Sequence, residues 1–289
     1  MRNIERISEE SGTDYYQMQH FISESKWDAR EVVNQVALEV STVLPKRKLT
    51  GLIIDESGWV KKGDKSVGVG WQYCGNVGKI SNSQVAVFAC LSNGDFASMI
   101  DSRLYLPKDW CDDPERCYEA ERKGTKGPMP KRLKATTDGI SVCNYLKTLD
   151  RQQWQKLSVR NTTKGVLTGE YHFARVYIWD KATDQTEQRL LVIRKTKPGK
   201  ATVEIKYSFT NANLEQYTPE ALAYMQAERF FIEHCIKEAK DILGLDQFQT
   251  RKWLAWHHQV ALNFLVSSFI LKEKLRCFED LPLLSARDI

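Results

Sequence analysis

The sequence predicts an α/β protein in which two helical regions flank two strand-rich segments. Apolar residues recur at helical spacing in the first 44 residues and again from Pro219 towards the C-terminus. Between these regions, short β-branched runs bounded by turn-forming residues indicate two groups of strands, at 49–91 and 154–209. With 289 residues, 42% of them hydrophobic and 27% charged, the chain is large enough for one core with an inserted or appended subdomain.

The N-terminal helical region is predicted to end at Pro45. Val32, Val36 and Val40 repeat at helical spacing before it, and a proline cannot continue a helix. The run LTGLIID follows directly and ends in an acid, which is typical of a buried strand. The runs KSVGVGWQYCG and SQVAVFACLSNG are separated by turn formers, so 49–91 predicts an antiparallel meander and 96–106 a further strand.

Residues 112–134 interrupt this pattern because they contain no apolar periodicity. Between Glu121 and Lys134, six Lys or Arg residues accompany one acid, with Gly and Pro among them. We interpret this stretch first as a solvated linker and second as a contact to a DNA backbone. A short amphipathic helix is expected at 140–149, before the second group of strands.

The C-terminal part is predicted to form two long helices. Thr218 is the expected N-cap of the first, because Pro219 suits the first helical position and Glu220 suits the positive end of the helix dipole. Gly244 is the expected end of this helix, and the second covers about 250–274.

Composition excludes several classes of protein. The seven cysteines are odd in number and form no CxxC pair, which argues against zinc ribbons and disulfide frameworks and predicts the reduced thiols of a cytoplasmic protein. The net charge of +5 permits a polyanionic partner without requiring one. The N-terminus is polar, and the apolar stretch 260–271 is too short to span a bilayer, so no membrane partner is expected.

The first chemical signal is Asp55, at the end of the strand GLIID. A strand fixes the backbone there, so the carboxylate can serve as a metal ligand beside other acids. Taken alone, an Asp that only caps a strand or turn is the favoured interpretation. Glu56 would point to the other face of the strand and is the weaker candidate.

The second signal is a stripe on the helix AYMQAERFFIEHCIKEAKDILG. Arg229, Glu233 and Lys240 are separated by three and then six residues, so all three lie close to one helix face. Such a stripe could aim an acid at metal ions and two cations at phosphates. The alternative is a solvated face with ordinary i,i+4 ion pairs.

These signals occur in the order of a known family. An acid after the first strand, further strands, a β-rich insertion and a helix with R-x3-E-x6-K together resemble the DDE transposases of bacterial insertion sequences. The strings YYQMQHFISESKWDA, DESGWVKKGDKSVGVGWQYCGNVGKISNSQVAVF, LYLPKDWCDD and LGLDQFQTRKWLAWHHQVALNFL carry the resemblance along most of the chain. It implies an RNase-H-like mixed-sheet α/β core, interrupted by a β-rich insertion and preceded by an N-terminal helical region.

The resemblance also implies a mechanism and partners. Asp55 and Glu233 would be catalytic metal ligands in a two-metal site for Mg²⁺ or Mn²⁺, while Arg229 and Lys240 would bind DNA phosphates. The substrates would be double-stranded DNA, namely terminal inverted repeats and target, bound by a homodimer. The chain would be cytoplasmic and associated with the nucleoid when bound to DNA.

The chain departs from the family pattern in two places. The family signature Y-x2-R-x3-E-x6-K has Tyr where this chain has Gln226, with Tyr224 two residues earlier, which puts that phosphate contact in doubt. The second Asp of the family follows a fourth core strand, and the corresponding stretch, 112–139, has no apolar strand. The nearest acids are Asp101, Asp138 and Asp150, and we favour an internal deletion over any of them as a ligand.

The expected organisation follows from these assignments. It comprises a DNA-binding helical region shortened at its start (1–47), the first part of the core (48–111) and a basic linker at the deletion junction (112–139). A β-rich insertion (140–215) and a helical second part of the core (216–289) follow. Three hypotheses remain: a functional transposase, a non-catalytic DNA-binding or dimerising remnant, and an interaction protein unrelated to DNA. Loss of the second Asp predicts impaired catalysis under the first.

Overall fold

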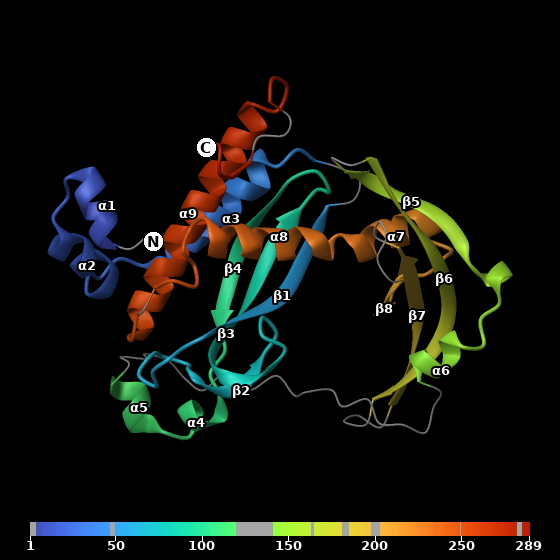
Figure 1. Cartoon of the computed structure of the whole chain (residues 1–289), viewed down its shortest axis with the longest axis horizontal. Helices are drawn as coiled ribbons and strands as arrows, with labels where there is room; N and C mark the ends of the chain where they lie inside the picture. Colours follow the sequence, from blue (N-terminus) through green and yellow to red (C-terminus); the bar gives the residue numbers. More distant parts are fainter. Residues whose placement is uncertain are drawn as a thin grey trace. The chain divides into compact units, whose positions relative to one another are not determined.

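The computed structural model describes residues 4–46, 50–119, 141–162, 165–180, 185–197, 203–248, 250–281 and 285–289 (Figure 1). The chain divides into two compact units, the first formed by 1–126 with 228–289 and the second by 127–227. Each unit contains one four-stranded antiparallel sheet together with helices, so the expected mixed α/β class is confirmed at that level. In the part of the chain that the structure describes, none of the helices has both the length and the hydrophobicity of a membrane-spanning segment.

The first unit combines one sheet with seven of the described helices. Its strands are β1 (Gly51–Val60), β2 (Gly70–Cys74), β3 (Lys79–Ser92) and β4 (Ala97–Leu104). Its helices are α1 (Ile4–Ser11), α2 (Tyr15–Ser23), α3 (Ala29–Val43), α4 (Lys108–Cys111), α5 (Pro114–Glu119), α8 (Arg229–Asp241) and α9 (Trp253–Arg276). The helical start and the helical end of the chain, which the sequence predicts, thus pack in one unit.

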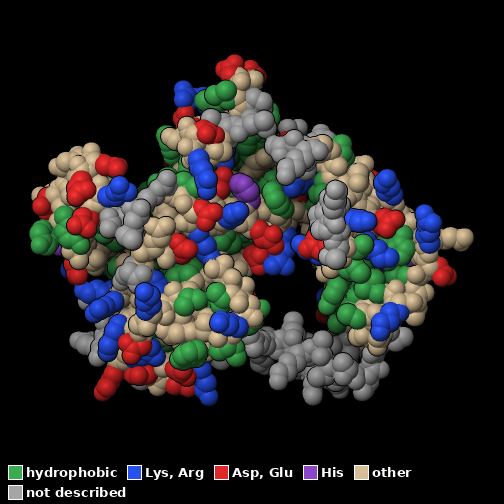
Figure 2. Space-filling model, viewed as in Figure 1, with side chains coloured by type: hydrophobic (Ala, Val, Ile, Leu, Met, Phe, Trp, Pro, Cys, Tyr) green, Lys and Arg blue, Asp and Glu red, His purple; other side chains and the backbone are tan. Residues whose placement is uncertain are grey.

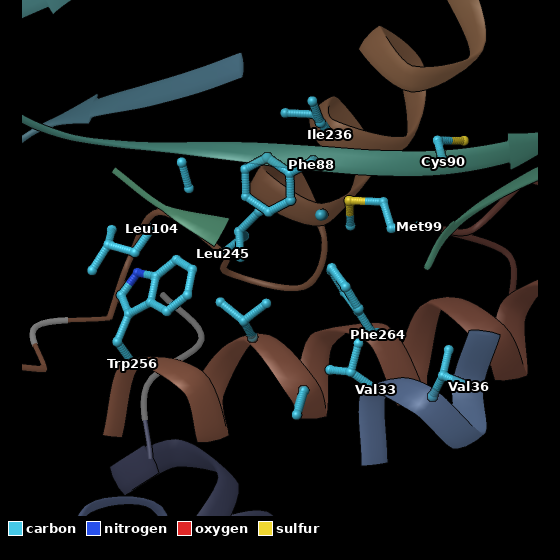
Figure 3. Packing of buried hydrophobic residues seen from close by; sticks show 14 of the residues in the cluster. Val33, Val36, Phe88, Cys90, Met99, Leu104, Ile236, Leu245, Trp256 and Phe264 are labelled. Carbon is cyan, nitrogen blue, oxygen red and sulfur yellow. The ribbon is translucent and has the colours of Figure 1, made fainter. Parts of the chain in front are cut away.

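The core of this unit lies between the sheet and helices α3, α8 and α9. Val33, Val36 and Val40 form the buried face of α3, and their spacing is the one that predicts the helix. Figure 3 shows side chains from these helices meeting Phe88 of β3 and residues of β4. Burial of this apolar surface is the main force that joins the two ends of the chain.

The sheet has a different strand order from the predicted meander, which is wrong in this respect. β3 lies between β1 and β2, and it also pairs with β4. β1 takes one edge of β3 along Ser83–Ser92, so β2 and β4 follow one another along the other edge. β3 has 14 residues and is therefore long enough to pair with both β2 and β4 along one edge. The apolar runs in the sequence could not reveal this arrangement. The second edge of β1 pairs with no strand in the described part of the chain.

Two short helices occupy the stretch after β4, where a linker was expected from residue 112. Trp110 of α4 is buried, and its indole Nε1 donates a hydrogen bond of 2.6 Å to the carbonyl of Val69. This anchor holds α4 and the following α5 against the strands, so the linker prediction is wrong for 114–119. The remainder of that stretch, 120–140, lies outside the described residues, and Asp138 lies with it.

The second unit is a sheet in the order β5-β6-β7-β8, with α7 packed on it. Its elements are α6 (Val142–Leu146), the 3-10 turn η1 (Arg151–Gln153), β5 (Gln155–Thr162), β6 (Gly165–Asp180), β7 (Gln185–Thr196), β8 (Glu204–Thr210) and α7 (Pro219–Ala227). Leu222, Ala223 and Ala227 of α7 are buried against Leu157 and Leu190 of the strands. The division of the chain therefore falls after Ala227, whereas a boundary at 215/216 was expected.

Candidate functional site

Asp55 lies on the helix-covered face of β1. Along this strand Ile53, Asp55 and Ser57 are half-buried, whereas Leu52, Ile54 and Glu56 are exposed, as alternation in a strand requires. Asp55 stands directly opposite the buried Phe88 of β3, and residues directly opposite share a face of the sheet.

Arg229, the first residue of α8, connects the two acids of the predicted site. Its guanidinium lies 3.1 Å from Oδ2 of Asp55 through Nη2, and its Nε donates to the same oxygen at 3.2 Å. The same Nε lies 3.2 Å from Oε1 of Glu233, one helical turn further along α8. Asp55 and Arg229, which are 174 positions apart in the sequence, are therefore in direct contact. We refer to Asp55, Arg229 and Glu233 as the acidic cluster.

Exposure makes the acidic cluster accessible to a ligand. The side chain of Arg229 is 67% exposed and that of Glu233 is 52% exposed, while Asp55 retains 16%. Ion pairs at this exposure are weak because water and salt screen them. A metal ion could therefore replace Arg229 as the partner of the carboxylates, and a phosphate could replace a carboxylate as the partner of Arg229, at small cost.

Lys240 lies at the other end of α8 and is turned towards β1. Its Nζ donates hydrogen bonds to Ser57 Oγ at 2.7 Å and to the carbonyl of Gly58 at 3.0 Å. The same nitrogen lies 5.7 Å from the centre of the Trp59 ring. Burial lowers the pKa of Lys240. This lysine fastens the helix to the strand that carries Asp55, so the phosphate contact expected of it stays a prediction.

The other candidate acids lie elsewhere. Asp101 of β4 accepts a hydrogen bond of 2.6 Å from Arg30 and a second of 3.3 Å from Arg103. It stands opposite Ala89, next in the strand to Phe88, so it belongs to the sheet face away from Asp55. Asp150 belongs to the second unit, as the N-cap residue of η1.

A divalent ion could use the acidic cluster only in part. Over the described residues, no group of three or more His, Cys, Asp and Glu side chains could hold a metal ion. Mg²⁺ is often bound by one or two carboxylates completed by water and phosphate oxygens. Asp55 and Glu233 therefore fit one such ion, provided that Arg229 moves aside.

One contact near the acidic cluster could not be recognised in the sequence. Glu228, just before Arg229, is buried, and a side chain at Gly51 would collide with its carboxylate. The glycine at the start of β1 thus lets α8 approach the strand closely, which places Arg229 within reach of Asp55. The only signal for this contact is a glycine before an apolar run, which many strands have.

Comparisons with known proteins match most of the chain. Residues 1–156 match the family model described as DDE superfamily endonuclease. The chain is also similar to the protein named "Probable transposase for insertion sequence element IS701" of Microchaete diplosiphon. The two are 39% identical over an alignment 285 residues long, and the match covers 86% of this chain and 72% of that protein.

Proposed function

This chain belongs to the DDE-type transposases of insertion sequences, and from that premise we propose that it binds the DNA ends of its element through the acidic cluster, with impaired cleavage. The observation that carries the proposal is the shared guanidinium. Arg229 gathers Asp55 from the first strand and Glu233 from a C-terminal helix, the two residues that the family pattern assigns to metal binding.

The side chains of the acidic cluster have distinct proposed roles. Asp55 and Glu233 would hold Mg²⁺ or Mn²⁺, which supplies positive charge beside a scissile phosphate. Arg229 would leave the carboxylates and pair with a DNA phosphate, for which a guanidinium is well suited. Lys240 would keep β1 in place through Ser57, so that Asp55 stays aligned with α8.

Impairment is proposed because the sequence at 112–139, where the family pattern has the strand before the second Asp, contains no apolar run that predicts a strand. In an RNase-H-like core, which we propose for the first unit, this Asp follows a fourth core strand. The free edge of β1 offers a place for such a strand, and none pairs there over the residues described.

The second candidate function is a non-catalytic transposase that binds DNA ends or forms dimers with an intact copy. It is favoured because, over the residues that the structure describes, the acidic cluster offers two carboxylates where the family pattern has three. A misplaced or missing ligand can lower a rate by about 100-fold or more. The active enzyme and the DNA-binding form of the second candidate both require binding to the terminal inverted repeats, and a homodimer on two ends remains part of the proposal.

The test is cleavage and binding of a duplex that carries the terminal inverted repeat, with Mg²⁺ or Mn²⁺. Nicking that disappears in Asp55→Asn and Glu233→Gln would support an active enzyme. Glu56→Gln is the matched control, because this exposed acid adjoins Asp55 but points to the other face of β1. Retention of DNA without nicking would support the non-catalytic candidate. Absence of any DNA binding at low salt, where backbone contacts are strongest, would refute the active enzyme and the DNA-binding form of the second candidate.

A further inference from the structure

The hairpin of β2 and β3 carries large side chains that the described part of the first unit leaves uncovered. Trp71 is 77% exposed, Ile80 66% and Tyr73 48%. Tyr73 stands opposite Ile80, and Trp71 stands opposite Asn82, so these side chains share one face of the hairpin. We refer to Trp71, Tyr73 and Ile80 as the hairpin patch.

The hairpin patch lies on the same sheet face as the acidic cluster. Ile80 and Asn82 are separated from Phe88 by an even number of positions in β3, and no register shift occurs between them. Phe88 in turn stands opposite Asp55 of β1. The patch and the candidate site are therefore on one side of one continuous sheet, at different positions along β3.

Exposed cations adjoin the hairpin patch. The side-chain amide of Asn82, opposite Trp71, donates hydrogen bonds to the carbonyls of Lys61 at 2.8 Å and Gly63 at 2.9 Å. These bonds fix the loop after β1, in which Lys62 and Lys65 are exposed, beside the hairpin. Figure 2 shows hydrophobic and Lys or Arg side chains next to each other in the region of β2.

We propose that the hairpin patch binds unpaired bases at a DNA end, with Trp71 as the stacking platform and Lys62 and Lys65 on the adjoining phosphates. Nucleic acid is the ligand that presents flat π faces and a regular series of anions together. An apolar protein partner would cover the aromatic side chains but would give the two lysines no counter-charge. This inference rests on the proposed function, since it assumes that the chain acts on DNA.

The experiment measures affinity by fluorescence anisotropy for two labelled duplexes, one blunt and one with a short single-stranded extension. Trp71→Ala is expected to weaken binding of the extended duplex by about 5- to 150-fold, the usual range for loss of one stacked base, and to leave the blunt duplex unchanged. Trp71→Phe should keep most of the affinity, because a phenyl ring also stacks. Tyr177→Ala is the matched control, since Tyr177 is a comparably exposed aromatic residue of the second unit.

The lysines are tested on the same two duplexes. Lys62→Ala and Lys65→Ala should each weaken both complexes and lower the salt dependence of binding by about one phosphate contact. If Trp71→Ala and the wild type bound the extended duplex with equal affinity, the hairpin inference would be overturned. The proposed function would still stand in that case, because the wild type binds DNA. An equal loss on both duplexes would overturn the stacking role as well. If the wild type bound neither duplex at low salt, the proposed function would fail and the hairpin inference with it.

Discussion

Helix α8 meets strand β1 at two places that differ in burial. At its N-terminal end, Arg229 reaches Asp55 and Glu233 with its guanidinium two-thirds exposed. At its C-terminal end, Lys240 is turned inward onto Ser57 and Gly58. Both ends join a cation of the helix to oxygen atoms, yet their physical situations are opposite.

The difference shows which end is suited to a ligand. An exposed ion pair contributes little to stability, so its partners can be exchanged for a metal ion or a phosphate at little cost. A partly desolvated ammonium that donates to two oxygen atoms cannot leave without exposing unpaired acceptors. The family pattern assigns both Arg229 and Lys240 to phosphate contacts, whereas in the structure the exposed Arg229 pairs with carboxylates and Lys240 is hydrogen-bonded to strand β1.

Removing the hydrogen bonds of Lys240 to β1 should have the largest effect on stability. Lys240→Ala is expected to lower the free energy of unfolding by about 2–3 kcal/mol, because the hydrogen bonds to Ser57 and Gly58 involve a charged donor. Chemical denaturation measures the change. Lys237→Ala, an exposed lysine of the same helix, should change the free energy by less than about 0.5 kcal/mol. Equal effects of the two substitutions would remove the distinction between the ends.

A second buried lysine gives the same region a pH dependence. The ammonium of Lys61 donates to the carbonyl of Phe248 at 2.7 Å, and burial lowers its pKa to about 8 from 10.5. Between these values the unfolded chain holds a proton that the folded chain has released, so stability due to Lys61 rises with pH in that window. Below about pH 8 both states are protonated, and the buried charge opposes folding.

We therefore expect the free energy of unfolding of the wild type, relative to Lys61→Met, to increase by on the order of 1 kcal/mol or more from pH 8 to 10.5. Denaturation at fixed ionic strength across this range measures the difference. Lys62→Met provides the control, since Lys62 is exposed and should give no trend. A relative stability of Lys61→Met that stays constant with pH would contradict the burial of an ammonium at this position.

Local sequence signals predicted the ends of helices well where interactions between residues close in sequence determine them. Thr218 accepts a hydrogen bond from the backbone of Ala221, and Gly244, with a φ of 70°, follows the end of α8 at Asp241, as expected from capping chemistry. The single helix expected between these two residues is wrong, because it is divided at Glu228 into α7, which packs on the sheet of the second unit, and α8, which belongs to the first. The strand order was wrong because pairing partners are chosen by contacts between distant segments. The helix at 114–119 was missed because Trp110, outside that segment, anchors it.

The candidate site was predictable in its residues but not in its contacts. Strand alternation placed Asp55, and helical spacing placed Arg229 and Glu233 on one face. Nothing local indicated that Arg229 would pair with both acids, since this depends on Gly51 admitting Glu228 against β1. The contact of Lys240 with β1 was equally impossible to predict. A spacing of seven residues tells which face of the helix a side chain lies on, but not how deeply that side chain is buried against the neighbouring strand.

The smallest expected effect on stability belongs to the exposed end of α8 and gives the sharpest test of the comparison. Arg229→Gln should change the free energy of unfolding by less than about 1 kcal/mol, since its ion pairs are screened. The same substitution should strengthen Mn²⁺ binding by about fivefold, because two neighbouring carboxylates lose the cation that neutralises them.

Electron paramagnetic resonance of free Mn²⁺, titrated against the protein, distinguishes the possible outcomes. Adding Glu233→Gln to Arg229→Gln should abolish the gain, as one carboxylate alone holds the ion poorly. A large loss of stability in Arg229→Gln, without any gain in Mn²⁺ affinity, would mean that the ion pairs at this end of the helix serve to stabilise the fold. Asp55 and Glu233 would then be partners of an arginine and not of a metal ion, and the cleavage role proposed for them would lose its physical basis.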